Sequence, residues 1–352
     1  MATTQPLDDA RVQAFIGKAL GDWGALTSAS LVVIGDKLGL YTALSEGGPA
    51  TPAELAQRTG TVEGYVRPWL INQAAGGYLE YSPETGKFSL PPEHAAALGA
   101  VVGAYYLFTA AMKAEPRITE GFKSGQGMLW GEHAPELFGG TERFFRSGYE
   151  QNLVQNWIPA MDGMQAKLAT GAVVADVGCG HGASTIILAQ AFPHSRFIGY
   201  DNHGPSVEHA REAASAAGLG EDRVSFQVAP AIGHPAVVGG YDLIAFFDSL
   251  HDMGDPVGAI RHAADTLASD GSVLLVEPMA GEHIEDNLNP VGQVYSGASV
   301  LICTPHAMAE SGRALGTIAP DSAIRDVVQA GGLTRFRRVT ETPVNRVFEA
   351  RR

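Results

Sequence analysis

Two carboxylates in this chain follow short apolar runs, and glycines surround the first of them. Asp176 lies near the end of the run Ala172–Val177 and is followed by three closely spaced glycines, Gly178, Gly180 and Gly182. Near-continuous apolar runs are typical of buried parallel strands, and glycines allow a tight turn and a close backbone approach. The pattern predicts a strand, a glycine turn and a helix, Ser184–Ala191, whose N-terminus points at a nucleotide-type cofactor.

The second carboxylate, Asp201, ends another apolar run, Arg196–Asp201. A carboxylate at the tip of the second strand accepts hydrogen bonds from ribose hydroxyls, both in NAD sites and in S-adenosylmethionine sites. Asp176 would repel a pyrophosphate but favours a sulfonium or ammonium group, which argues for S-adenosylmethionine. The spacing of Gly178, Gly180 and Ala183 also fits a relaxed dinucleotide fingerprint, so spacing alone leaves NAD open.

From about Ala160 onward the chain resembles the class I S-adenosylmethionine-dependent methyltransferases. Asp176–Gly180 stands in the position of their first motif, and Asp201 in that of their ribose-binding acid. The resemblance implies an α/β fold with a Rossmann-like seven-stranded methyltransferase sheet. The expected further strands are Arg223–Val228, Tyr241–Phe247, Ser272–Glu277 and an antiparallel closing pair, Arg335–Glu341 and Asn345–Ala350. The expected further helices are Pro205–Ala217, Pro256–Ala268 and Asp321–Ala330.

The resemblance also implies S-adenosyl-L-methionine as the cofactor. Many relatives hold the adenine amino group with an acidic residue where this chain has Val228–Pro230, so adenine recognition must differ here. We expect Phe247 to stack or pack against the purine and Asp248 to supply a polar contact. The expected cofactor-binding residues are Asp176, Gly178, Gly180, Asp201, Asn202, Phe247 and Asp248.

The predicted fourth strand leads into Phe247–Met253, at the edge where open α/β sheets place reactive groups. This segment resembles the His-Asp-Trp signature of the small-molecule O-methyltransferases, with Met253 in place of the tryptophan. The resemblance implies that His251 removes the acceptor proton and that Glu277, at the end of the fifth strand, orients it. Imidazole suits this task because its pKa lies near working pH. A second orienting glutamate, expected near Ile318, is not found.

Three other interpretations of His251 and of the acceptor atom stay open. His251 and Asp252 could simply cap the helix that begins near Pro256. Together with His306 they also supply two histidines and a carboxylate, the ligand set of a non-haem iron site that would assist C- or N-methylation. Without the second glutamate, the acceptor atom could be oxygen, nitrogen or carbon. We expect oxygen and no metal.

Residues 26–90 show the order of a winged helix. An apolar helix runs to Leu44, a second begins at Pro52, and a third covers Val62–Ala75. Thr51 and Glu54 form a capping box at the start of the second helix. Two short strands around a Pro83–Gly86 turn complete the predicted motif.

A winged helix raises the alternative of a transcription regulator that senses S-adenosylmethionine. DNA binding requires Lys and Arg on the groove-facing helix, yet Val62–Ala75 offers only Arg67 and carries Glu63. The net charge of −14 also repels phosphate. The O-methyltransferase relatives use such a domain for dimerisation and as a wall of the acceptor pocket, which implies a homodimer that binds a small-molecule acceptor and no nucleic acid.

The segment between the two predicted domains carries apolar and aromatic residues. Ala95–Met112 has eighteen residues without a charge, which meets the length of a membrane span, but its Ala, Gly and Tyr content favours a helix buried between domains. Aromatic and amide side chains follow in Thr141–Met164. We expect four of them to line the acceptor pocket: Phe144, Tyr149, Asn152 and Trp157.

Length and composition limit the class of protein. A chain of 352 residues with 45% hydrophobic and 18% charged residues predicts a globular enzyme of about two domains. Two cysteines imply no disulfide framework, and the polar opening Met1–Asp9 does not resemble a signal peptide, so we expect a cytoplasmic protein. The expected boundaries are 1–95 for a winged-helix dimerisation domain, 96–165 for a helical connector and 166–352 for the cofactor-binding domain.

Overall fold

The computed structural model describes residues 7–310, 312 and 314–352. Most of the polar opening segment, Met1–Pro6, therefore lies outside the described residues. The chain divides into two compact units, Met1–Thr109 and Ala110–Arg352. Helix α5 (Pro92–Ala111) runs through the expected boundary at residue 95 and reaches the division.

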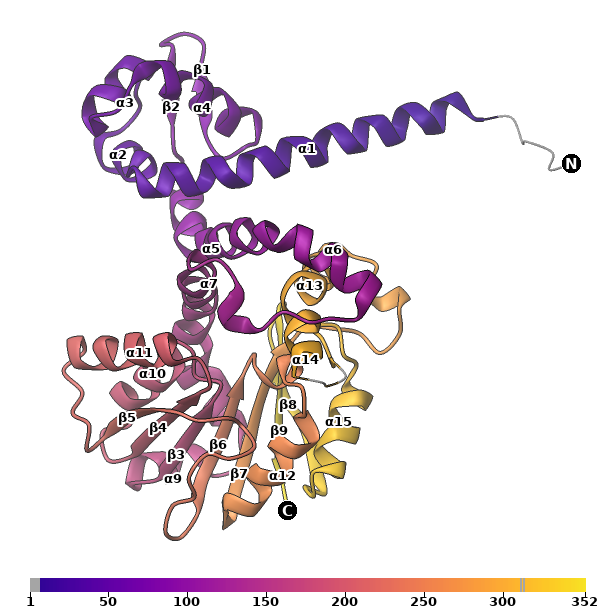
Figure 1. The fold of residues 1–352 in the computed structure, drawn as a ribbon. Helices are drawn as coiled ribbons and strands as arrows, with labels where there is room; N and C mark the ends of the chain where they lie inside the picture. Colours follow the sequence, from indigo (N-terminus) through magenta and orange to yellow (C-terminus); the bar gives the residue numbers. More distant parts are fainter. Residues whose placement is uncertain (1–6, 311, 313) are drawn as a thin grey trace, which may run out of the picture. The chain divides into compact units, whose positions relative to one another are not determined.

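The first unit is a small helical domain with a two-stranded hairpin (Figure 1). Its elements are α1 (Asp9–Lys37), α2 (Leu40–Gly47), α3 (Pro52–Thr59), α4 (Glu63–Ala75), β1 (Glu80–Ser82), β2 (Lys87–Ser89) and most of α5. Thr51 caps α3, since its hydroxyl accepts from the Glu54 backbone while the Glu54 side chain accepts from the Thr51 backbone. The predicted capping box is therefore confirmed.

The prediction of a single apolar helix ending at Leu44 is wrong. The chain has two helices here, α1 and α2, separated at Gly39, whose φ of 67° is left-handed. Glycine adopts this conformation without the steric cost that other residues carry, so it ends one helix and redirects the chain into the next.

Helix α5 is less buried than expected. In the described part of the chain, the stretch Pro92–Ser124 is long and apolar enough to cross a membrane, by length and composition only. In its apolar 18-residue window, 28% of the residues are buried within the single chain. Among its residues Leu98, Val102 and Leu107 are buried, whereas Val101 is 44% exposed. The prediction of a buried helix holds for one face only.

The second unit contains a seven-stranded sheet with the order β5-β4-β3-β6-β7-β9-β8. The strands are β3 (Val173–Val177), β4 (Arg196–Asp201), β5 (Val224–Val228), β6 (Tyr241–Phe247), β7 (Leu267–Pro278), β8 (Arg335–Glu341) and β9 (Asn345–Arg351). Strands β3 to β7 pair in parallel, while β9 is antiparallel to both β7 and β8. The predicted antiparallel closing pair is confirmed.

Helices cover both faces of this sheet (Figure 1). The helices of this unit are α6 (Glu115–Ser124), α7 (Glu136–Asn152), α8 (Ile158–Ala160), α9 (Met164–Thr170), α10 (Ala183–Ala191), α11 (Gly204–Ala216), α12 (Pro256–Thr266), α13 (Pro290–Ala298), α14 (Thr304–Ala309) and α15 (Asp321–Ala330), of which α10 and α11 lie on one face of the sheet and α12 and α15 on the other. Two π-helical turns occupy Leu153–Trp157 and Ser299–Cys303.

Alternate residues of each strand serve the two faces of the sheet. Val174 packs with α10 and α11 in one apolar cluster, whereas Ala175 packs with α12 and α15 in the other. Since successive strand side chains point to opposite faces, a strand buried on both sides must be apolar throughout. This explains the continuous apolar runs in the sequence and brings the carboxyl ends of β3, β4, β6 and β7 to one edge.

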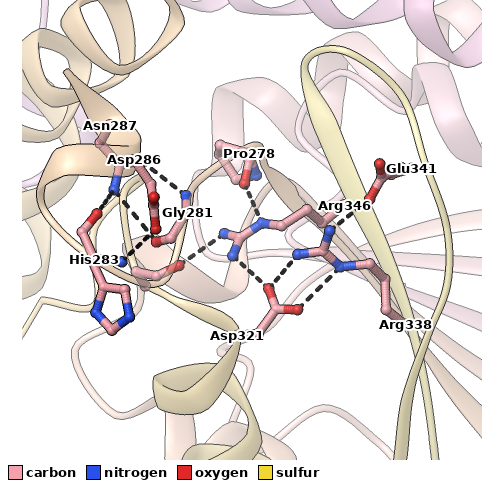
Figure 2. Close-up of polar contacts among 10 residues, drawn as sticks. Pro278, Gly281, His283, Asp286, Asn287, Asp321, Arg338, Glu341 and Arg346 are labelled. Atoms are coloured by element: carbon pink, nitrogen blue, oxygen red, sulfur yellow. Dashed lines mark hydrogen bonds and ion pairs between the residues drawn. The ribbon is translucent and has the colours of Figure 1, made fainter. Parts of the chain in front are cut away.

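A buried guanidinium fastens the end of β7 to its neighbours (Figure 2). Arg346 on β9 is 1% exposed and donates to the backbone oxygens of Pro278 and Ala319, each at 2.8 Å. It also donates to Asp321 at the start of α15, which accepts from Arg338 of β8 as well. The network holds α15 and the β8–β9 hairpin against the strand end that carries Glu277.

Candidate active site

The carboxylate at the end of β3 is buried and only partly satisfied. Asp176 is 1% exposed, and its Oδ2 accepts hydrogen bonds of 2.6 Å from Ser184 and Thr185 of α10. Its Oδ1 is buried without a hydrogen-bond partner among the described residues. Burial raises the pKa of Asp176 to about 6, although the two hydroxyls oppose this. A buried carboxylate oxygen without a donor fits an ammonium or another donor of a bound molecule.

The glycine turn leaves room beside this carboxylate. Gly178 and Gly180 have φ values of 77° and 52°, so other residues would be strained at both positions. A Cβ on Gly178 would lie 2.6 Å from the Ser249 side chain, whereas a Cβ on Gly180 would meet no described atom within 4 Å. The backbone at Gly180 is therefore open to a ligand.

Asp201 at the end of β4 closes the other side of the turn. Its Oδ2 accepts from the Gly180 backbone at 2.9 Å, and its Oδ1 accepts from the His203 backbone at 2.8 Å. Each carboxylate oxygen has a second lone pair that can accept a hydroxyl. Asn202 is exposed and donates to Glu310 at 3.3 Å. Its assignment to the cofactor stays a prediction.

The end of β6 places Phe247 and Asp248 on the same edge. Phe247 is buried and packs against Tyr149 at a ring distance of 5.6 Å. Asp248 has a φ of 50° and accepts from Tyr149 Oη at 3.2 Å and from Asn345 Nδ2 at 2.9 Å. Burial, and next to it the charge of Glu277, raises the pKa of Asp248 to about 8. A strained, buried carboxyl is typical of functional sites.

His251 lies one turn further, between two carboxylates. It is 3% exposed, and its Nδ1 lies 2.6 Å from Glu277 Oε2. Its Nε2 lies 3.1 Å from Asp252 Oδ1. Burial alone would lower the pKa of His251, but the charges of Asp252 and Glu277 outweigh it and raise the pKa well above its ordinary value.

The segment near Ile318 supports His251 without a second glutamate. The backbone nitrogen of Gly316 donates to the carbonyl of His251 at 3.1 Å. Asp252 supplies the second carboxylate from the adjacent position. The sequence indicates Asp252 only as a helix cap or a metal ligand, and no pattern in it predicts the contact with Nε2.

The structure does not group His306 with His251 and Asp252 as a set of metal ligands. His306 Nδ1 accepts from the Trp130 backbone at 3.1 Å, and its Nε2 lies 3.7 Å from Glu310 Oε1. Among the described residues, Cys303 instead groups with His251 and Asp252, with ligand atoms within 4.8 Å of one another. Burial raises the pKa of the Cys303 thiol to about 12, which opposes the thiolate that metals require.

The four expected pocket residues have different surroundings. Phe144 and Tyr149 belong to a run of aromatic contacts on α7, and Tyr149 reaches Asp248. Asn152 is half-buried and bonds to the Gly148 carbonyl of its own helix at 2.9 Å. Trp157 is 1% exposed and lies in the core next to Tyr149. Their role as pocket residues stays a prediction.

Comparison with known proteins agrees with this geometry. Residues 168–319 match a methyltransferase domain family, and residues 26–100 match the Rv2258c-like winged HTH domain. The chain is 31% identical over 140 residues to 27-O-demethylrifamycin SV methyltransferase of Amycolatopsis mediterranei (strain S699), a match that covers 38% of this chain and 50% of the relative. The chain thus spans half the length of that curated relative.

Two solved structures share the whole fold. Mitomycin 7-O-methyltransferase has a TM-score of 0.71 at 19% identity, with 98% of this chain and 99% of that chain covered. Human N-acetylserotonin methyltransferase, solved in complex with SAM, has a TM-score of 0.67 at 17% identity and covers 100% of this chain and 99% of its own. The chain therefore combines an Rv2258c-like winged helix-turn-helix domain with a methyltransferase domain.

Proposed function

We propose that this protein transfers a methyl group from S-adenosylmethionine to an oxygen of a small molecule, with His251 as the general base. The observation that carries the proposal is the 2.6 Å contact between His251 Nδ1 and Glu277 Oε2 at the carboxyl edge of the sheet. Both side chains are buried, at 3% and 1% exposure. A buried carboxylate at Nδ1 fixes the tautomer and leaves Nε2 for the acceptor.

The residues at the ends of β3 and β4 fit the cofactor. The unpartnered Oδ1 of Asp176 would accept from its ammonium group, and Asp201 would accept from its ribose hydroxyls. The open backbone at Gly180 leaves space for the sugar. The cofactor supplies a methyl group on a positively charged sulfur, which makes the methyl carbon an electrophile.

The chain's own residues control the acceptor proton. Nε2 of His251 now contacts Asp252, so an acceptor hydroxyl must replace that contact before it donates to the ring. The imidazole must also be neutral at that moment, because an imidazolium has no acceptor. As the acceptor oxygen bonds to the methyl carbon and the carbon–sulfur bond breaks, the acceptor proton would pass to Nε2, and Glu277 would stabilise the resulting imidazolium.

Proton removal by a general base is not the largest expected contribution to the rate of methyl transfer. A positioned general base contributes about 10²- to 10⁴-fold, while alignment of the reacting atoms contributes up to about 7 to 11 kcal/mol. The rigid environment of His251 serves both, since burial and the Glu277 contact hold the ring in one orientation.

The His251→Ala variant tests this function. We expect it to bind S-adenosylhomocysteine as the unchanged protein does, by calorimetry, and to lose about 10²- to 10⁴-fold in turnover on an alcohol or phenol acceptor. His283→Ala, which alters an exposed histidine, is the matched control. Undiminished turnover in His251→Ala would remove the general-base role.

In this proposal the acceptor is a small molecule, and the winged helix does not bind DNA. Arg67, the one basic residue in the sequence of α4, forms an ion pair with Glu63 of the same helix. A gel shift at low salt checks this, because a DNA-binding protein would retard duplex DNA in a salt-dependent way.

We further propose that the winged-helix unit forms a homodimer through α1. Exposed apolar residues recur along it at helical spacing: Val12, Ile16, Leu20 and Trp23, with Phe15 and Leu26 beside them. Such a stripe is normally covered by an apolar surface. Helix α1 carries three acidic and three basic residues, so its own net charge is zero although that of the chain is −14.

A further inference from the structure

Three side chains with metal-binding groups converge from three elements beside the glycine turn. Glu142 comes from α7, His181 from the turn itself and His209 from α11. Glu142 Oε2 lies 3.0 Å from His181 Nδ1 and 3.5 Å from His209 Nε2. The proposed methyl transfer uses none of these residues.

The spacing of these atoms matches that of ligands around one metal ion. Zinc binds nitrogen and carboxylate oxygen at about 2.0–2.2 Å, which places two ligands of a tetrahedron about 3.3–3.6 Å apart. The two measured separations, 3.0 and 3.5 Å, lie close to that range, and all three ligand atoms fall within 4.8 Å of one another. Small side-chain movements would complete the geometry.

The surroundings hold the ligands in this position. The other carboxylate oxygen of Glu142 accepts from Arg146, one helical turn away. The rings of His181 and His209 stack at a centroid distance of 4.0 Å with an angle of 29° between their planes. The side chains of Glu142 and His181 are 15% and 13% exposed, and that of His209 is 48% exposed, so an ion can enter from solvent on one side.

Arg146 orients the carboxylate of Glu142. A carboxylate with a charge-assisted partner on its second oxygen is a common arrangement around bound metals, since the partner orients the ligand.

We propose that Glu142, His181 and His209 bind a transition-metal dication such as Zn²⁺, with the remaining position open to water. Two imidazoles and one carboxylate favour Zn²⁺, Co²⁺ or Ni²⁺ over Mg²⁺ and Ca²⁺, which prefer oxygen ligands alone. Binding requires Nδ1 of His181 to carry no proton, because only an unprotonated ring nitrogen can bind a metal. This site is separate from the chemistry at His251.

A bound ion would join three elements that are otherwise linked by weaker contacts. It would tie α7 and α11 to the turn that carries Gly180, which faces the expected cofactor. A metal that binds only the folded chain raises its melting temperature. The site therefore predicts a stabilising effect that is independent of catalysis.

The experiment uses the full chain without a histidine tag, first treated with a chelator. Co²⁺ is titrated in while the visible absorption is recorded, and Zn²⁺ is then added to displace it. We expect one equivalent of each ion to bind, with the absorption of a four- or five-coordinate site, and the melting temperature to rise.

Variants assign the bound ion to these residues. His209→Ala and Glu142→Gln should each weaken binding at least about tenfold and abolish the rise in melting temperature. Cys303→Ser, which alters the other cluster of ligand atoms, should change neither. Circular dichroism and S-adenosylhomocysteine binding show that the variants are folded. Absence of binding to the unchanged chain overturns the site, as does binding that survives both His209→Ala and Glu142→Gln or is lost in Cys303→Ser.

Discussion

Glu277 and Arg346 occupy directly opposed positions on the antiparallel strands β7 and β9. The first holds the Nδ1 side of His251, and the second donates to the carbonyl of Pro278, the residue that follows Glu277. These two opposed residues thus hold the expected base, His251, and fix the end of β7, which carries Glu277.

The buried guanidinium should be essential to stability. Replacing Arg346 with methionine fills similar space but leaves the carbonyls of Pro278 and Ala319 without their donor and leaves Asp321 with Arg338 alone. Each buried polar group that loses its partner costs about 1–3 kcal/mol. We therefore expect the Arg346→Met variant to lose about that amount of unfolding free energy in chemical denaturation.

Arg338→Met is the matched control for that variant. Arg338 also binds Asp321, but its side chain is 32% exposed and Asp321 keeps Arg346 in its absence. A partly exposed ion pair contributes about 0–1 kcal/mol. Equal losses of unfolding free energy in the two variants would contradict a special role for the buried Arg346.

Glu277→Gln tests the orientation of the imidazole. The amide cannot stabilise an imidazolium and can present its NH₂ group to Nδ1, which favours the wrong tautomer. We expect kcat to fall about 10²-fold or more, with little change in S-adenosylhomocysteine affinity by calorimetry. Glu282→Gln, an exposed change in the next loop, should leave kcat unaltered. A loss of less than twofold in Glu277→Gln would exclude the positioning role.

The strands of the sheet and the residues at their ends were predictable from sequence. Arg196–Asp201 and Tyr241–Phe247 match β4 and β6 because a strand buried on both faces must be apolar, and polar residues mark where it leaves the core. Because parallel strands run in the same direction, their carboxyl ends meet at one edge of the sheet. Asp176, Asp201 and His251 could therefore be placed together without coordinates.

Contacts that depend on distant segments could not be predicted. Asp248 meets Tyr149 and Asn345, which are 99 and 97 residues away in the chain. Cys303 reaches the His251 and Asp252 cluster through the π-helical turn Ser299–Cys303. A local sequence pattern does not predict which distant residues come into contact. Periodicity does not reveal the break between α1 and α2, because apolar residues stand on both sides of Gly39.

The pH dependence of catalysis should follow His251. The base must be neutral, so kcat/KM rises with pH and levels off above the pKa of His251. Because the charges of Asp252 and Glu277 raise this pKa, the acidic limb of the profile should lie well above pH 6.5. Asp252→Asn removes one of the two charges, and we expect its limb to move to lower pH.

The measurement is kcat/KM of both proteins across the pH range, with S-adenosylmethionine saturating. Asp255→Asn, which changes a carboxylate that caps α12, serves as the control and should keep the limb of the unchanged protein. A limb that stays in place in Asp252→Asn would show that a group other than His251 titrates.

The cofactor site can be tested apart from catalysis. Asp176→Asn keeps an acceptor for Ser184 and Thr185 but removes the charge next to the expected ammonium group. A hydrogen bond to a charged group contributes about 1.5–3 kcal/mol, so calorimetry should show S-adenosylhomocysteine binding weakened about ten- to hundredfold. The exposed change Glu221→Gln should have no effect. NADH should not bind the unchanged chain, and its binding would contradict the choice of cofactor.

The proposed homodimer predicts a mass of twice 36.9 kDa in light scattering. Helix α1 has 29 residues and is about 43 Å long, and Phe15 and Trp23 on it are 70% and 61% exposed. Placing a carboxylate at both positions would bury like charges in a symmetric contact, since each change occurs twice. The double variant Phe15→Glu/Trp23→Glu should therefore run as a monomer, whereas Gln13→Glu should remain dimeric. A monomeric unchanged protein, or a double variant that stays dimeric, would show that α1 is not the interface.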